Sequence, residues 1–83
     1  MGRSGNKLTD IEVQTMDAIK DFWDEHKYSP AYEDIVLVIV HPISTVQVAI
    51  HNLKKFGLIT QDRGVSRSIV ITDDGRDFFK KAA

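Results

Sequence analysis

The stretch STVQVAIHNLKKFGLI, residues 44–59, contains a complete helix signal followed by the start of a strand. Apolar side chains recur every three or four positions, which is the spacing of one buried helix face, at Val46, Ala49, Ile50 and Leu53. The opposite face carries Thr45, Gln47, Val48, His51, Asn52, Lys54 and Lys55. With Ser44 as the N-cap and Gly57 as a left-handed stop, the pattern predicts a helix over about 44–56.

Two further helix starts precede this segment. Thr9-Asp10-Ile11-Glu12 is a capping box, and the helical spacing of the apolar residues that follow it predicts a helix over about 10–26. Ser29-Pro30 is the second start, because Ser caps helices and Pro suits the first helical position. We therefore expect the second helix to begin there.

The run Ile35 to Val40 gives conflicting signals. Its β-branched residues favour a buried strand on propensity alone. The Ser-Pro start and the acidic pair Glu33-Asp34 favour a helix, since carboxylates stabilise the positive end of the helix dipole. We predict a short and largely buried helix that ends near Val40, ahead of Pro42.

Downstream of the central helix, the chain alternates between strand and turn signals. Residues 58–61 and 68–71 predict two short strands around a Gly-containing loop, which makes a β-hairpin. Thr72-Asp73-Asp74 then opens a last helix. The order helix, helix, helix, hairpin, helix is that of a winged helix-turn-helix domain. We predict a mainly α fold with a small hairpin, in which a three-helix core plus wing and a C-terminal helix span 8–83 after a flexible leader, 1–7.

Length and composition exclude several classes of protein. Eighty-three residues leave room for one small domain. The absence of Cys excludes disulfide scaffolds and Cys-ligated zinc sites. The longest apolar run has six residues, against the ~20 that a membrane helix needs, and the chain does not open with a signal peptide. A soluble cytoplasmic protein without membrane association is the expectation.

Charge is distributed unevenly along the chain, although the net charge is only −1. Residues 10–34 hold eight acidic side chains against two lysines, a net charge of −6. Residues 35–72 hold four basic side chains against one acidic, a net charge of +3. Two opposite fields on a small domain indicate a positive working face and a negative back. Chance clustering on solvated faces is the alternative.

Several segments resemble the DNA-binding domain of the LexA repressor family. They are Leu8-Thr9, Tyr28-Ser29-Pro30, Leu53-Lys54-Lys55-Phe56-Gly57-Leu58-Ile59, and Gly64-Val65-Ser66-Arg67-Ser68-Ile69, which is similar to the family's wing motif Gly-Ala-Ser-Arg-Gly-Ile. The segment Ile71 to Arg76 is similar instead to the wing-to-helix passage of MarR- and PadR-type regulators. The chain departs from LexA at Val40-His41-Pro42, where the family usually has Gly and a turn one residue longer. The family's self-cleaving domain has no counterpart here, so autoproteolysis is not implied.

This order of elements assigns a candidate DNA-reading face to the central helix. A helix fits the major groove with its N-terminal exposed face toward base edges, here Ser44, Thr45, Gln47, Val48 and His51. Gln can pair with adenine, Thr and Val can contact the thymine methyl, and His can donate to guanine N7 or to a phosphate. Backbone or minor-groove contacts are expected from Lys54, Lys55 and the wing residues Arg63, Ser66 and Arg67. The alternative is an ordinary solvated helix face.

Other chemistry finds little support in the sequence. His26, His41 and His51 fall in three different elements, so no metal site is predicted. Ser66 lacks the second Gly of a nucleophile elbow, and no Gly-rich phosphate loop is present. We expect no enzyme activity and no cofactor.

The sequence therefore predicts a sequence-specific regulator of transcription that binds double-stranded DNA, with repression as the favoured mode. A homodimer is expected through Phe78 and Phe79, because one helix cannot easily bury two adjacent aromatic rings in its own core. The alternative is a winged-helix protein-interaction module without DNA binding. A continuous basic face on the central helix and wing would favour DNA, and a mixed or apolar face would favour a protein partner.

Overall fold

A computed structural model describes residues 8–82, which form four helices and a two-stranded hairpin. The elements are α1 (Asp10–His26), α2 (Tyr32–Ile39), α3 (Ile43–Lys55), β1 (Ile59–Thr60), β2 (Val70–Ile71) and α4 (Asp73–Ala82). The predicted fold class, mainly helical with a small hairpin, is confirmed, and so is the order of the elements. The predicted leader, 1–7, lies outside the described residues.

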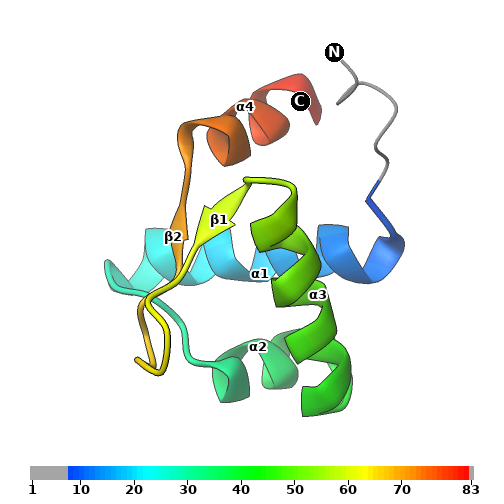
Figure 1. Ribbon diagram of the computed structural model, residues 1–83, viewed down its shortest axis with the longest axis vertical. Helices are drawn as coiled ribbons and strands as arrows, with labels where there is room; N and C mark the ends of the chain where they lie inside the picture. The colour runs from blue at the N-terminus through cyan, green and yellow to red at the C-terminus, as the bar shows by residue number, and fades with distance from the viewer. Residues whose placement is uncertain (1–7, 83) are drawn as a thin grey trace.

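The arrangement is that of a winged helix (Figure 1). Helix α1 passes behind α3 and the hairpin, with α2 on one side of it and α4 on the other. The strands are antiparallel, with Ile59 opposite Ile71 and Thr60 opposite Val70. Helices α2 and α3 meet at 108°, within the range of about 90–120° that is typical of a helix-turn-helix pair.

One hydrophobic core joins the first three helices to the hairpin. Its largest fully buried side chains are Met16, Ile19, Ile35, Val46, Ile50, Leu53, Ile59 and Ile69. The predicted buried face of α3 is confirmed, since all four of its apolar positions are buried. The core therefore fixes which face of α3 is left open to solvent.

The start of α1 is capped as predicted, and the same cap ties α1 to α3. The hydroxyl of Thr9 accepts a hydrogen bond from the Glu12 N–H (3.3 Å), while a Glu12 carboxylate oxygen accepts one from the Thr9 N–H (3.0 Å). The other Glu12 oxygen accepts a hydrogen bond from the Asn52 side-chain amide (2.9 Å). Asn52, assigned above to the exposed face of α3, is half-buried because it makes this contact.

Helix α2 begins later than predicted. Its first residue is Tyr32, after Ala31 at the N-cap position, so the assignment of Ser29 and Pro30 to the cap and first turn is wrong. The carboxylate of Asp34 accepts from the Ala31 N–H (2.9 Å) and serves this helix end instead. Ser29 does not cap because its hydroxyl accepts a hydrogen bond from the hairpin, at the Ile69 N–H.

The β-branched run is helical, as predicted, but it is not largely buried. Only Ile35 is fully buried, whereas Leu37, Val38 and Val40 are 79%, 61% and 82% exposed. Successive residues of a helix point about 100° apart, so a two-turn helix can direct only one stripe of side chains to the core. Val40 ends the helix in the left-handed conformation, with φ of 58°.

Helix α3 begins at Ile43, and Pro42 occupies its N-cap position without a side-chain hydrogen bond. The prediction of Ser44 as the cap is therefore wrong. The fixed φ of Pro suits the entry to a helix and needs no hydroxyl partner. The C-terminal prediction is confirmed, since Gly57 follows Phe56 with φ of 77°.

Among the described helices, none alone is long and apolar enough to span a membrane. Helices α2 and α3 reach the required length and hydropathy only when they are taken together across their bend.

The last helix is joined tightly to the hairpin. The Thr72 hydroxyl donates to the Gly57 carbonyl (2.6 Å) and accepts from the Gly75 N–H (3.1 Å). Position 75 requires glycine because the backbone passes close to its neighbours, and a Cβ there would collide with the Leu58 carbonyl oxygen and the Ile71 side chain. The segment after α3, the hairpin and α4 are thus held together by the Thr72 hydroxyl and by close packing at Gly75.

Candidate nucleic-acid interface

The candidate reading face of α3 is largely exposed. Ser44, Gln47, Val48 and His51 are exposed, and Thr45 is half-buried. Lys54 and Lys55 continue the exposed face toward the end of the helix. The structure therefore leaves most of the predicted α3 residues open to a partner.

A groove of about 510 Å³ separates α3 from the wing, the loop of residues 62–68. Gln47 and Lys54 line it from α3, and Arg63, Ser66 and Arg67 line it from the wing. The predicted site residues of these two elements are thus brought together across one groove.

The remaining candidates lie elsewhere on α3. Ser44, Thr45 and Val48 line a second groove, of about 440 Å³, beside the start of α1. By helical spacing, His51 and Lys55 lie on the crest of α3 between the two grooves. The ten predicted residues therefore form one crest with a groove on each side, rather than a single concave site.

The wing loop is a defined turn held by its own hydrogen bonds. Gly64 takes a φ of 73°, and the Val65 N–H donates to the Asp62 carbonyl (3.2 Å). The Ser68 hydroxyl accepts from the Asp62 N–H (3.0 Å) and donates to the Val65 carbonyl (2.8 Å). This role of Ser68 was not predicted from the sequence. The turn that it stabilises leaves Arg63 and Ser66 exposed at the edge of the groove.

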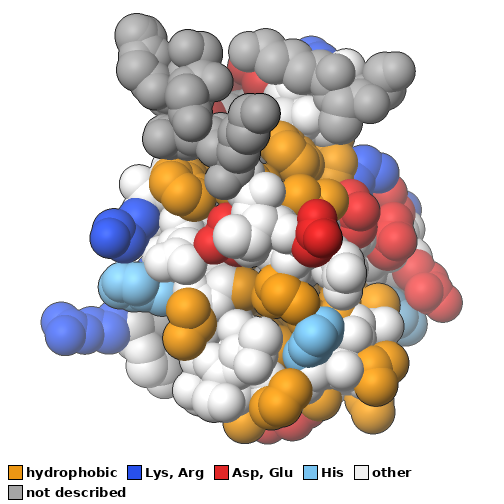
Figure 2. Space-filling model, turned by 90° about the vertical axis from the view of Figure 1, so that its right-hand side faces the viewer, with side chains coloured by type: hydrophobic (Ala, Val, Ile, Leu, Met, Phe, Trp, Pro, Cys, Tyr) orange, Lys and Arg blue, Asp and Glu red, His pale blue; other side chains and the backbone are white. Residues whose placement is uncertain are grey.

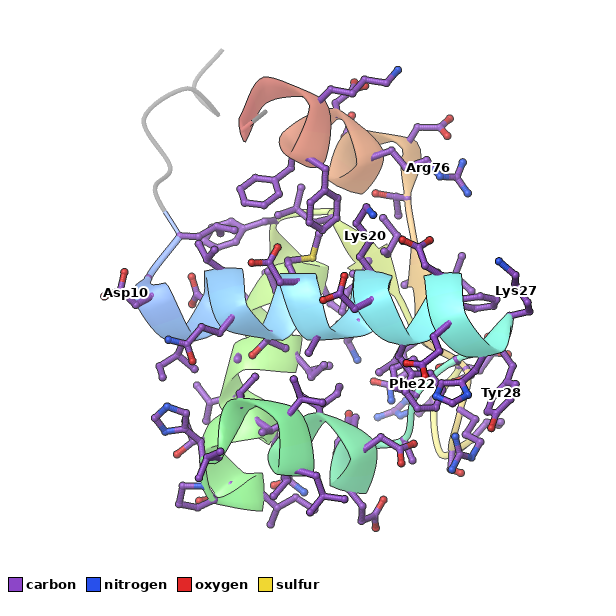
Figure 3. The ribbon with its side chains drawn as sticks, turned by 180° about the vertical axis from the view of Figure 1, so that it is seen from behind. Asp10, Lys20, Phe22, Lys27, Tyr28 and Arg76 are labelled. Atoms are coloured by element: carbon purple, nitrogen blue, oxygen red, sulfur yellow. The ribbon has the colours of Figure 1, made fainter. Side chains whose placement is uncertain are left out.

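Arg67 points back into the chain. Its guanidinium lies 2.9 Å from an Asp34 carboxylate oxygen and donates to the Ser29 carbonyl at 3.3 Å. It also lies 5.8 Å and 5.3 Å from the ring centroids of Phe22 and Tyr28, at the C-terminal end of α1 (Figure 3). The positive charge of Arg67 is therefore paired within the chain, although its side chain is 44% exposed.

Arg63 differs from Arg67, although the two flank the same loop. It is exposed and forms no ion pair within the part of the chain that the structure describes. Both arginines line the groove, and they differ in that Arg67 is paired with Asp34 and Arg63 is not. That both contact DNA stays a prediction.

The base of the wing is fastened to α1 and the loop after it. The Ile69 N–H donates to the Ser29 hydroxyl (2.9 Å), and the Ile69 carbonyl accepts from the Trp23 indole N–H (2.9 Å). Ser29 and Ile69 are both buried. These contacts were not predicted from the sequence. A signal for the Trp23 contact was present, because the N–H of a largely buried indole usually has a hydrogen-bond acceptor.

Charge on the α3 and wing face is mixed. The groove between them is also lined by Glu33 and Asp62, both exposed. Figure 2 shows the molecule from the side away from the wing, where Lys and Arg side chains project mainly at the left edge, and Asp and Glu side chains gather at the right edge and also lie near the centre. The candidate face is therefore not continuously basic.

The last helix buries more of its aromatic pair than expected. Phe78 and Phe79 are both half-buried and pack against the core, with their ring centroids 5.3 Å apart. Lys20 extends from α1 toward α4 and lies 5.7 Å from the Phe79 ring (Figure 3). Neither ring is fully buried, so part of each stays accessible to a partner. Dimerisation through these rings stays a prediction.

Among the described residues, no three His, Cys, Asp or Glu side chains lie close enough to hold a metal ion together.

No family model matches the chain, and no curated protein sequence matches it either.

Proposed function

We propose that this chain is a sequence-specific regulator of transcription that binds double-stranded DNA in the cytoplasm, with repression as its favoured mode. In this proposal α3 enters the major groove and the wing contacts the backbone or the minor groove. The observation that carries it is the placement of Gln47 and Lys54 opposite Arg63 across one groove, beside a helix pair that meets at 108°. The resemblance of the wing and of the end of α3 to LexA-type repressors also supports it.

Base reading in this proposal falls to side chains without formal charge. Gln47 can pair with adenine, Val48 can contact a thymine methyl, and His51 can donate to guanine N7. No Asp, Glu, Lys or Arg occurs between Ile35 and Leu53. Discrimination would therefore come from hydrogen bonds and apolar contacts, worth about 1–3 kcal/mol for each good bidentate pair.

Phosphate binding falls to the exposed cations at the margins of the crest. Lys54 and Lys55 extend from the end of α3, and Arg63 faces them from the wing. Three phosphate contacts give an expected salt slope of about −3 for log K against log salt on duplex DNA. Arg67 is assigned a positioning role, because its charge is already paired with Asp34.

The test begins with selection of bound sequences from random duplex DNA by the full chain. Fluorescence anisotropy then compares the selected duplex with a random one. Gln47→Ala is expected to cost about 1–3 kcal/mol on the selected duplex and little on the random one. Lys80→Ala, which removes an exposed cation of α4, is the control and should bind like the parent. A parent that binds neither duplex would end the proposal.

The second candidate function is a winged-helix module that binds a protein. Glu33 and Asp62 within the groove favour it, because carboxylates there would face DNA phosphates. The same titration separates the two candidates. Salt-sensitive binding to DNA supports the first, and its absence supports the second.

A further inference from the structure

We propose that a second copy of this chain docks on the apolar surface at the end of α2 and the start of α3. This surface, called the α2 patch, consists of Leu37, Val38, Val40 and Ile43, which are 79%, 61%, 82% and 43% exposed. Figure 2 shows hydrophobic side chains along the lower edge of the molecule, where Figure 1 places α2. Ile43 also lines the groove assigned above to DNA, so the α2 patch reaches one edge of that groove. The inference does not rest on DNA binding and is tested without DNA.

The fold itself does not account for the α2 patch. Helix α2 contributes Ile35 to the core as its only fully buried residue. Val40 is left-handed, with φ of 58°, a conformation that is strained for a β-branched residue and free of strain for glycine. The chain therefore retains an exposed valine side chain at a position where it costs stability, which points to a contact outside the fold.

The α2 patch would supply the apolar centre of a dimer interface. Its four side chains expose on the order of 100 Å² each, which amounts to about 800 Å² over two copies. A specific interface buries about 1,200–2,000 Å² in total, so residues around the patch must supply the remainder. An exposed apolar patch of about 400 Å² per chain is often functional.

The charge pattern favours a second copy as the partner. Residues 35–53 carry no Asp, Glu, Lys or Arg, so the four patch side chains bring no like charges together, and the exposed Glu33 lies at the margin of the patch, one turn before Leu37. A two-fold dimer uses the same patch on both chains, as this arrangement requires. The acidic surface of α1 would repel its own copy, and Phe78 and Phe79 of α4 are already half-buried in the core.

Sedimentation equilibrium of the full chain without DNA tests the proposal, at concentrations from about 10 μM to 1 mM. The parent is expected to self-associate, and Leu37→Glu to weaken association at least ~10-fold. Val40→Gly should weaken association as well, while its thermal stability stays equal to that of the parent or rises because the backbone strain is relieved. Val70→Glu, at a 45% exposed position of β2 that does not line the groove next to Ile43, is the matched control and should associate like the parent.

Three results would overturn the proposal. The first is a parent that stays monomeric over the whole range. The second is association that Phe79→Ala weakens and Leu37→Glu does not, which would place the interface on α4. The third is equal weakening by Val70→Glu and Leu37→Glu, which would mean a nonspecific effect of added negative charge. Since no DNA is present, none of these results bears on the proposed function.

Discussion

The two sides of the wing differ in how far their polar groups are satisfied within the chain. On the side toward α1, both backbone groups of Ile69 are hydrogen-bonded by side chains, and Arg67 is paired with Asp34. On the side toward α3, Arg63 and Ser66 are exposed, and neither is hydrogen-bonded or ion-paired to a described residue. The comparison shows that one loop can hold the fold together at one edge and leave the other edge free for a partner.

The largest expected effect is at Trp23, on the α1 side. Trp23→Ala should lower the free energy of unfolding by about 3 kcal/mol, because it removes a large packed ring and the donor to the Ile69 carbonyl. Trp23→Phe keeps most of the ring and should cost about 1 kcal/mol. Urea unfolding followed by circular dichroism measures both. Losses under half of these values would mean that the wing is not fastened through Trp23.

Ser29 gives the next largest effect. Ser29→Ala leaves the buried Ile69 N–H without an acceptor, so the free energy of unfolding should fall by about 1–3 kcal/mol. Ser66→Ala, on the exposed tip of the wing, is the matched control and should stay within about 0.5 kcal/mol of the parent. Equal losses for the two variants would remove the difference between the two sides.

The two wing arginines sharpen the same comparison. Arg67→Ala should cost about 1 kcal/mol of stability, a modest value because the side chain is 44% exposed and its ion pair is screened by solvent. Arg63→Ala should change stability by less than about 0.5 kcal/mol. Hydrogen exchange should quicken at wing amides in the first variant and not in the second. Unchanged exchange in Arg67→Ala would exclude a positioning role.

The smallest effect is expected at an exposed ion pair of α1. A hydrogen bond from Lys20 (2.7 Å) holds the pKa of the Asp24 carboxyl below its ordinary value. The pair therefore stabilises the fold at pH values above that ordinary pKa, and its contribution is lost as pH falls through the lowered one. Lys20→Met should raise the pKa of Asp24 toward its ordinary value in an NMR titration. An unmoved pKa would show that the pair does not persist in solution.

The elements were predictable because their signals are local. The Thr9–Glu12 capping box, the three-to-four spacing of α3 and the stop at Gly57 involve neighbours in the sequence. The caps at Ser29 and Ser44 were predicted wrongly. Ser44 lies inside α3, which begins at Ile43 after Pro42. The hydroxyl of Ser29 instead binds an N–H that the tertiary structure brings to it. For Ser29 that N–H belongs to Ile69, 40 residues away.

Burial and pairing were less predictable than secondary structure. In the run Ile35 to Val40 every residue is apolar, so periodicity gives no indication of which side faces the core. The candidate face of α3 could be predicted because it is opposite a clear apolar stripe. The pairing of Arg67 could not, since Asp34 and the α1 aromatic rings meet it only after folding.

The salt dependence of binding to a random duplex tests the central claim most directly, with the parent, Arg63→Ala and Arg67→Ala compared in one series. The account predicts that log K falls with log salt for the parent and that the slope for Arg63→Ala is shallower by about one unit. It predicts that Arg67→Ala keeps the slope of the parent, because its charge is already neutralised by Asp34. A parent without salt-sensitive binding, or a slope that changes for Arg67→Ala and not for Arg63→Ala, would contradict the account.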